Sequence, residues 1–275
     1  MAIMLFDKLT ADCSEKYTMS IRLRPGGLSF SAYNRSVHDA FFYKELELDR
    51  SKPYARALED CFFEYPFLTW AYKRIQVVCE TSQYTIVPKE IFEEERKREL
   101  LSFAFTNPQG RCLHNELEAL QAVVVFGMDE EVYAFCSRSL VAPRFIHHLT
   151  ALLPLWEKQS QTRLPKQLYV TLYPRRMDIA CYAQGNLLFV NSFNFESPDD
   201  VLYYILYVWK QAGMDQQKDQ LRLFGEMSLR VALTETLRNY LQYVDLQEIP
   251  SEAYLLGSEI LQAPLDLIAL SICES

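Results

Sequence analysis

The stretch Ser20-Ile-Arg-Leu-Arg-Pro-Gly-Gly-Leu-Ser-Phe-Ser-Ala-Tyr33 decides the fold. Polar and apolar side chains alternate in 20–24 and again in 28–33, and Pro25-Gly26-Gly27 separates the two runs. Alternation with a period of two is typical of strands, and a Pro/Gly cluster between two such runs is typical of a turn. The stretch therefore predicts a β-hairpin.

Three further elements follow the hairpin. The run 40–48 has the apolar spacing of a strand, and 54–65 repeats apolar residues at helical spacing behind Ser51, a candidate N-cap. Residues 74–80 form an apolar run of the length expected for a buried strand. The predicted order is β-β-β-α-β.

The same order returns in residues 167–226. The predicted strands are 168–173, 177–182, 186–195 and 220–226, with a helix from 196 to about 213. The two hairpins superimpose without gaps, so that Pro25 pairs with Pro174 and Tyr33 with Tyr182. The turns, the alternate positions of the apolar residues along each strand and the order of the elements all match. We interpret this match as an internal duplication.

The remaining segments complete the organisation. We expect strands at 84–88 and 122–128 and helices at 89–100, 130–140, 149–158 and 228–242. The polar stretch 159–166 is the expected boundary, which gives a first half at 1–162 with extra strands and helices and a second half at 163–275.

Composition narrows the class of protein. The 275 residues carry 28 Lys+Arg against 36 Asp+Glu, a net charge of −8, and 49% are hydrophobic. An acidic chain with a large core argues against disorder and against a nucleic-acid binder. No apolar stretch reaches the length of a membrane span, and the start lacks the basic segment of a signal peptide, so we expect a cytoplasmic protein without membrane insertion. Seven cysteines without a CxxC pair fit free thiols in a reducing compartment.

A three-stranded meander, a crossover helix and another strand, occurring twice, resemble the actin, Hsp70 and sugar-kinase superfamily. More narrowly, the chain is similar to an uncharacterised bacterial domain family with an actin-like ATPase fold. The stretches that carry the resemblance are 20–31, 187–193 and 199–206. The resemblance implies an α/β (α+β) fold of duplicated ribonuclease-H-like halves, β-β-β-α-β-α, in an actin-like ATPase arrangement around a nucleotide cleft.

The resemblance also places the remnants of a nucleotide site. Active relatives carry an Asp on the first strand of each hairpin, to organise metal and water, and glycines in each turn, whose amides bind phosphate. The positions that match the Asp hold Arg22 and Thr171. The first turn keeps its glycines, whereas the second has arginines instead; these four residues are Gly26, Gly27, Arg175 and Arg176.

The adenosine-binding motif of the relatives, a strand followed by paired small residues and a helix, matches 221–228. Gly225 survives there, and Glu226 adds bulk and negative charge where the base or ribose would lie. The chain has only eight glycines, and none of them stands at the spacing of GxGxxG or GxxxxGK[ST]. We therefore expect no ATPase of the usual mechanism, no catalytic residue, and no cofactor; ATP with magnesium is the disfavoured alternative.

Other candidate sites have plainer interpretations. Arg175 and Arg176, with Arg163 and Lys166 upstream, fit either an anion site or, preferably, a solvated hairpin tip. The strand-end residues Glu80 and Glu226 suggest a nuclease, but their first-strand partners are not carboxylates, so exposed loop positions are favoured.

No metal site is expected from the histidines. His147 and His148 are adjacent in sequence and cannot share one face of a strand or a helix. The favoured function is a non-catalytic scaffold or protein-interaction module with an unidentified protein partner and an undetermined oligomeric state. The alternative is an ATP-binding protein or ATPase of the actin-like superfamily with an atypical site.

Overall fold

The computed structural model describes residues 9–108, 110–161 and 165–273. By their contacts these residues form two compact units: one runs up to Ala151 and resumes at Pro250, and the other is Leu152–Ile249. The predicted boundary at 162/163 falls on residues outside the described ranges, so the division into halves there stays a prediction. The compact units differ from it because the end of the chain packs with the first unit.

The first unit is built on a mixed five-stranded sheet of order β3-β2-β1-β4-β8. Its strands are β1 (Thr18–Arg24), β2 (Gly27–Tyr33), β3 (Phe41–Glu47), β4 (Arg74–Cys79) and β8 (Arg144–His147). The hairpin β1–β2 and its neighbour β3 are antiparallel, whereas β4 and β8 run parallel to β1. The predicted hairpin is thus the centre of the sheet.

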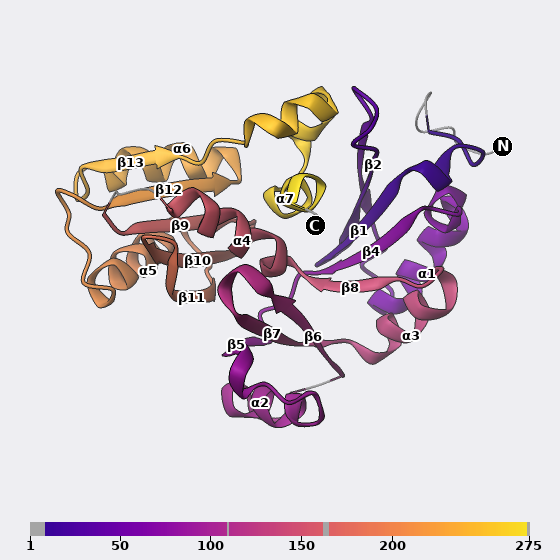
Figure 1. The fold of residues 1–275 in the computed structure, drawn as a ribbon, viewed down its shortest axis with the longest axis horizontal. Coiled ribbons are helices and arrows are strands. Elements are labelled where there is room, and N and C mark those ends of the chain that lie inside the picture. The colour runs from indigo at the N-terminus through magenta and orange to yellow at the C-terminus, as the bar shows by residue number, and fades with distance from the viewer. Residues whose placement is uncertain (1–8, 109, 162–164, 274–275) are drawn as a thin grey trace. The chain divides into compact units, whose positions relative to one another are not determined.

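Helices lie on both sides of this sheet (Figure 1), with α1 (Tyr54–Glu64) and α3 (Glu130–Ser139) on one side and α7 (Leu265–Cys273) on the other. Phe62 of α1 and Phe135 of α3 meet edge to face at 4.9 Å between ring centroids. Asp129 caps α3 by accepting a hydrogen bond from the Val132 amide. Helix α4 (His148–Ser160) begins in the first unit and ends in the second.

An insertion between β4 and β8 forms a small sheet of order β5-β7-β6. Its elements are β5 (Tyr84–Pro88), α2 (Lys97–Ala104), β6 (Arg111–Leu117) and β7 (Ala122–Met128). Leu101 of α2 packs on Val123 and Val125 of β7. Short 3-10 helices complete the chain at Ser14–Lys16, Pro66–Thr69, Lys89–Ile91, Glu94–Arg96, Glu118–Leu120, Ser251–Leu256 and Ser258–Gln262.

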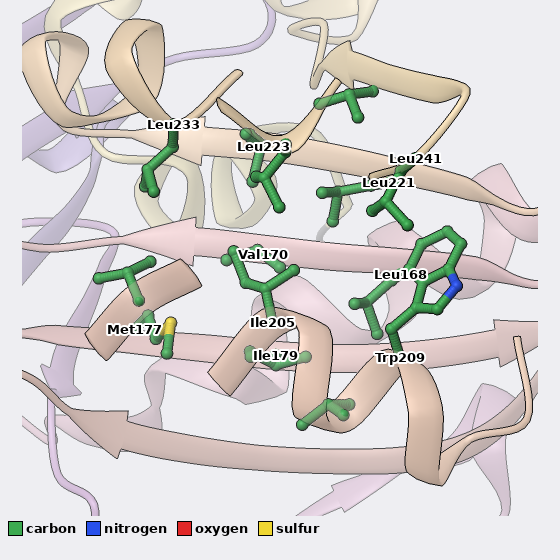
Figure 2. Packing of buried hydrophobic residues seen from close by; sticks show 14 of the residues in the cluster. Leu168, Val170, Met177, Ile179, Ile205, Trp209, Leu221, Leu223, Leu233 and Leu241 are labelled. Atoms are coloured by element: carbon green, nitrogen blue, oxygen red, sulfur yellow. The ribbon is translucent and has the colours of Figure 1, made fainter. Parts of the chain in front are cut away.

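The second unit repeats the first topology, with a sheet of order β11-β10-β9-β12-β13. Its elements are β9 (Gln167–Leu172), β10 (Arg176–Ala183), β11 (Asn186–Asn194), α5 (Pro198–Gln211), β12 (Gln220–Gly225), α6 (Met227–Leu237) and β13 (Tyr243–Leu246). Figure 2 shows Ile205 and Trp209 of α5 packed over the apolar face of this sheet. Since the strand order and directions match those of the first unit, the topology agrees with the predicted repeat.

The structure corrects several element predictions. Residues 89–100 do not form one helix: two 3-10 turns precede α2, which continues to Ala104. The helix predicted at 228–242 ends at Leu237. The strands β6, β8 and β13 and the helix α7 were not predicted.

All seven cysteines are free thiols, and Cys61, Cys79, Cys136 and Cys181 are buried. Burial raises the pKa of the Cys181 thiol from 9.0 to about 11 and the pKa of the Cys136 thiol to about 12. These groups therefore stay protonated in the folded chain at pH values where the unfolded chain ionises.

We predict a loss of stability at alkaline pH. A group whose folded pKa is raised stabilises the fold below its unfolded pKa, and this contribution is lost as the pH rises through the folded value. Cys181 alone should account for about 2 kcal/mol of that loss. Urea midpoints from about pH 8 to about pH 11 should fall less steeply in Cys181→Ala than in the wild-type chain. Cys273→Ala, at an exposed position, should leave the profile unchanged; identical profiles for all three chains would refute the assignment.

Candidate functional site

Arg22, at the position predicted for the metal-organising Asp, lies in a buried ion-pair cluster with Glu80 and Asp266. Its Nη1 is 2.6 Å from Glu80 Oε2, and its Nε donates to Asp266 Oδ2 at 2.6 Å. The three side chains are 4%, 7% and 0% exposed. We call these three residues the Arg22 cluster. A guanidinium held this closely by two carboxylates is engaged within the chain itself.

Distant parts of the sequence bring the cluster together. Arg22 is on β1, Glu80 follows the neighbouring parallel strand β4, and Asp266 is in the first turn of α7. The other end of α7 is also fixed, because Tyr33 Oη donates to the Leu270 carbonyl at 3.2 Å and Arg35 Nε to the Ser271 carbonyl at 2.5 Å. Side-chain donors thus satisfy carbonyls that a helix end leaves open. Polar contacts at both ends hold α7 against the sheet.

The sheet face beneath α7 is polar. Ser20, Ser29 and Ser31 are each 1% exposed, and Ser20 Oγ donates to Gln76 Oε1 at 2.8 Å. The opposite face carries the apolar Ile21 and Phe30, which alternate with these residues along the same strands. This buried polar face makes its hydrogen bonds inside the unit, as buried polar groups do in native proteins.

Pro25 and Gly26 form the turn between β1 and β2, whereas Gly27, predicted as part of the turn, is the first residue of β2 and pairs with Arg24. Gly26 has a φ of +77°, a conformation that favours glycine. A Cβ on Gly27 would stand 2.7 Å from the Leu46 carbonyl oxygen of β3. The hairpin and its neighbouring strand therefore account for both glycines.

Thr171, the counterpart of Arg22 in the second unit, is 2% exposed, and its Oγ1 has no hydrogen-bond partner among the described residues. It lies opposite Asp178 in the β9–β10 register. Asp178 is fully buried, accepts a hydrogen bond from Ser192 Oγ at 2.5 Å, and is 3.6 Å from Arg176 Nη2. The second unit thus has a carboxylate opposite Thr171, but it lies on the second strand of the hairpin, β10.

The structure separates the two arginines of the second hairpin. Arg175 is exposed, whereas Arg176 is 8% exposed and lies 4.7 Å from the Tyr173 ring centroid as well as beside Asp178. Lys166 Nζ donates to the carbonyls of Ala212 and Gly213 at the end of α5. Arg163 lies outside the described residues. Arg176 and Lys166, which were candidates for one anion site, thus contact different groups of the chain.

Gly225 and Glu226 join β12 to α6. Gly225 has a φ of +106°, and a Cβ there would collide with the carbonyl oxygen of Leu172 on β9. Glu226 is exposed at the start of α6, where its amide donates to the same carbonyl at 3.1 Å and its Oε1 accepts from Ser228 Oγ. The start of a helix favours an anionic ligand, and here the Glu226 carboxylate occupies that position. The contact with β9 explains why glycine is present.

Sequence reasoning missed Asp266 and Asp178, and it named Glu80 but predicted its environment wrongly. Glu80 was expected on an exposed loop, but its side chain is 7% exposed against Arg22. Asp266 gave no signal, because it pairs with a residue 244 positions away. Asp178 had a weak signal, because it is the one carboxylate of the strand 176–183 and the other residues after Arg176 are apolar or aromatic.

The side chains of His147 and His148 lie close together, although adjacent residues were expected to face different sides of a strand or helix. His147 ends β8 and His148 begins α4, and at this junction their rings are 4.3 Å apart and buried. His147 Nε2 contacts the Thr81 carbonyl and His148 Nδ1 the Cys79 carbonyl. Within the described ranges, no group of three or more His, Cys, Asp or Glu side chains is placed to hold a metal ion.

The fold is that of an actin-like ATPase. A Bacteroides thetaiotaomicron protein of unknown function with this fold superimposes with a TM-score of 0.84 at 30% identity, over 97% of this chain and 99% of its own. A PilM–PilN type IV pilus biogenesis complex contains a chain that matches with a TM-score of 0.51 at 14% identity, over 92% of this chain and 93% of its own.

Residues 7–244 match DUF3822, a family described as protein of unknown function, and the chain belongs to this family. Among curated proteins, none matches the sequence. None of the helices in the described part of the chain is both long and apolar enough to cross a bilayer.

Proposed function

We propose that this protein is a non-catalytic scaffold or protein-interaction module that acts in the cytoplasm and whose nucleotide motifs have degenerated. The Arg22 cluster carries the proposal. In active relatives an Asp at this position organises a metal and water; here a guanidinium takes its place and is neutralised by Glu80 and by Asp266 of α7.

The residues present do not fit ATP with magnesium. A triphosphate needs amide or cationic donors, and a magnesium ion needs oxygen ligands. The first hairpin offers a cation paired within the chain, and the helix start at Glu226 offers a carboxylate. The glycines Gly26, Gly27 and Gly225 all have structural reasons independent of a ligand. Their survival therefore gives no support to a phosphate site.

A role in protein interaction has support from the shared fold. The matching pilus protein was solved in a complex named for PilM and PilN, so this fold occurs in a protein assembly. We extend only the general role to this chain: its unidentified partner is proposed to be a protein, not a nucleic acid.

The test is a thermal-shift titration of the full chain with Mg-ATP and Mg-ADP. A ligand at a hundredfold excess over its Kd would stabilise the fold by about 2.7 kcal/mol, which would raise Tm measurably. We expect no change in Tm with either nucleotide. A rise with Mg-ATP that shrinks in Arg175→Ala, an exposed position at the second hairpin, would instead support the alternative of an atypical ATP-binding site.

A further inference from the structure

The strand β11 forms one end of the second unit's sheet, since the strand order of the described residues stops there. Its nine residues, Asn186–Asn194, include no charged side chain. Leu188 is 51% exposed, and Val190 and Phe193 are half-buried. An edge strand presents backbone donors and acceptors that can pair with another chain, and natural proteins usually block long apolar edges.

The corresponding edge of the first unit is blocked in this way. Strand β3 carries Lys44, Glu45 and Glu47. The Glu259 carboxylate, from the segment Ser258–Gln262, accepts a hydrogen bond from the Tyr43 amide at 3.3 Å. Two strands at the same topological position thus differ: β3 is charged and contacted, whereas β11 is uncharged and partly exposed, with a register shift opposite Cys181 and Tyr182.

Aromatic residues of α5 extend the apolar surface beside β11. The Tyr204 ring stacks on Phe193 of β11 at 4.7 Å, and Tyr203 packs against Tyr204 at 5.4 Å. Tyr207 stacks on Tyr203 at 5.9 Å between ring centroids. Tyr203 is 62% exposed and Tyr207 is 46% exposed. Exposed tyrosines supply large contact areas at low entropic cost, and they are enriched at interfaces.

One end of β11 is acidic. Glu196 and Asp199 are exposed just beyond Asn194, at the start of α5. A basic side chain on a bound segment would complement them. A second copy of this chain would bring another net charge of −8 to the contact, and charge of one sign opposes self-association.

We propose that β11 binds an extended segment of a partner protein by β-strand addition. The segment adds as a further strand to the sheet, places apolar or aromatic side chains at alternate positions beside Phe193 and the α5 tyrosines, and carries Lys or Arg at the end near Glu196. Main-chain hydrogen bonds provide affinity in this mode of recognition, and alternate side chains provide specificity. The inference rests on the proposed interaction role only in requiring a protein partner.

The experiment selects short random peptides displayed on phage against the immobilised full chain, followed by calorimetry with the synthesised peptides. We expect alternating apolar residues with a basic end. N-methylation of one alternate set of peptide amides should weaken binding by about tenfold or more, and N-methylation of the other set should have little effect. Only a strand paired along one edge has this dependence.

Protein variants locate the binding edge. Leu188→Lys should abolish peptide binding, whereas Val37→Lys, at a 47% exposed apolar position in the first unit, should retain it. Failure to select such peptides, or binding indifferent to Leu188→Lys, would overturn the proposal and leave the nucleotide titration unaffected. A dimer in light scattering that Leu188→Lys converts to a monomer would also overturn it, because the occupant would then be a second copy.

Discussion

Arg22→Met is expected to lower the free energy of unfolding by about 3–5 kcal/mol. Methionine has a similar length and fills much of the same space, so the loss comes from the charges that remain. Glu80 and Asp266 would be left buried without the guanidinium that lies 2.6 Å from each. Carboxylates out of water are costly unless they are paired and hydrogen-bonded. Urea denaturation of the full chain, followed by circular dichroism, measures the change.

Arg24→Met is the matched control for this substitution. Arg24 is two residues further along β1 and also pairs with two carboxylates, Glu45 and Glu47, but those are 57% and 63% exposed. Exposed ion pairs contribute about 0–1 kcal/mol, so Arg24→Met should have a small effect. Equal losses in the two variants would contradict the special role of burial.

A triple variant separates charge from packing. Arg22→Met combined with Glu80→Gln and Asp266→Asn removes all three charges, so it should be more stable than Arg22→Met alone. If the three substitutions were simply additive, the side chains would not act as a cluster. The Arg22 cluster would then give no reason for α7 to stay on this face of the sheet.

Local patterns were sufficient to predict the framework of the fold. The alternation of polar and apolar residues in 20–33, with the turn between its two runs, corresponds to β1 and β2. The same arrangement of apolar residues in 168–182 corresponds to β9 and β10. The strands β8 and β13 have only four residues each, too few for a periodic signal. Helix α7 is buried from Leu265 to Ser271, so it shows no amphipathic face by which to recognise it.

The contacts of the candidate site residues could not be predicted from the sequence. The resemblance to the actin-like superfamily matched Arg22 and Thr171 to the position of the Asp, and this match stays a prediction. No local pattern could show that Arg22 is paired with Asp266, because that contact depends on the return of the chain end to the first sheet. Likewise, only the close approach of β12 to β9 shows why Gly225 is a glycine.

Gly225→Ala is expected to prevent the second unit from folding, or to cost about 4 kcal/mol or more. Gly225 has a φ of +106° and pairs with Leu172 in the parallel β9–β12 register. An added Cβ would collide with the Leu172 carbonyl oxygen, which is backbone and cannot move aside as a flexible side chain could. Relief would require β9 and β12 to separate, although Leu168, Val170, Leu221 and Leu223 on these strands form the centre of the core (Figure 2). The yield of folded chain and the urea midpoint report the effect.

Gly213→Ala controls for backbone strain alone. Gly213 also has a positive φ, +58°, but an added Cβ would meet nothing closer than Lys166 Nζ at 3.7 Å. Its cost should therefore be about 1–2 kcal/mol, the penalty of a left-handed conformation. If Gly225→Ala were as mild as Gly213→Ala, packing would no longer explain the glycine. A nucleotide contact would then be the better explanation of its presence, and the scaffold proposal would lose one of its supports. A large difference between the two variants would instead show that the fold itself requires glycine at position 225.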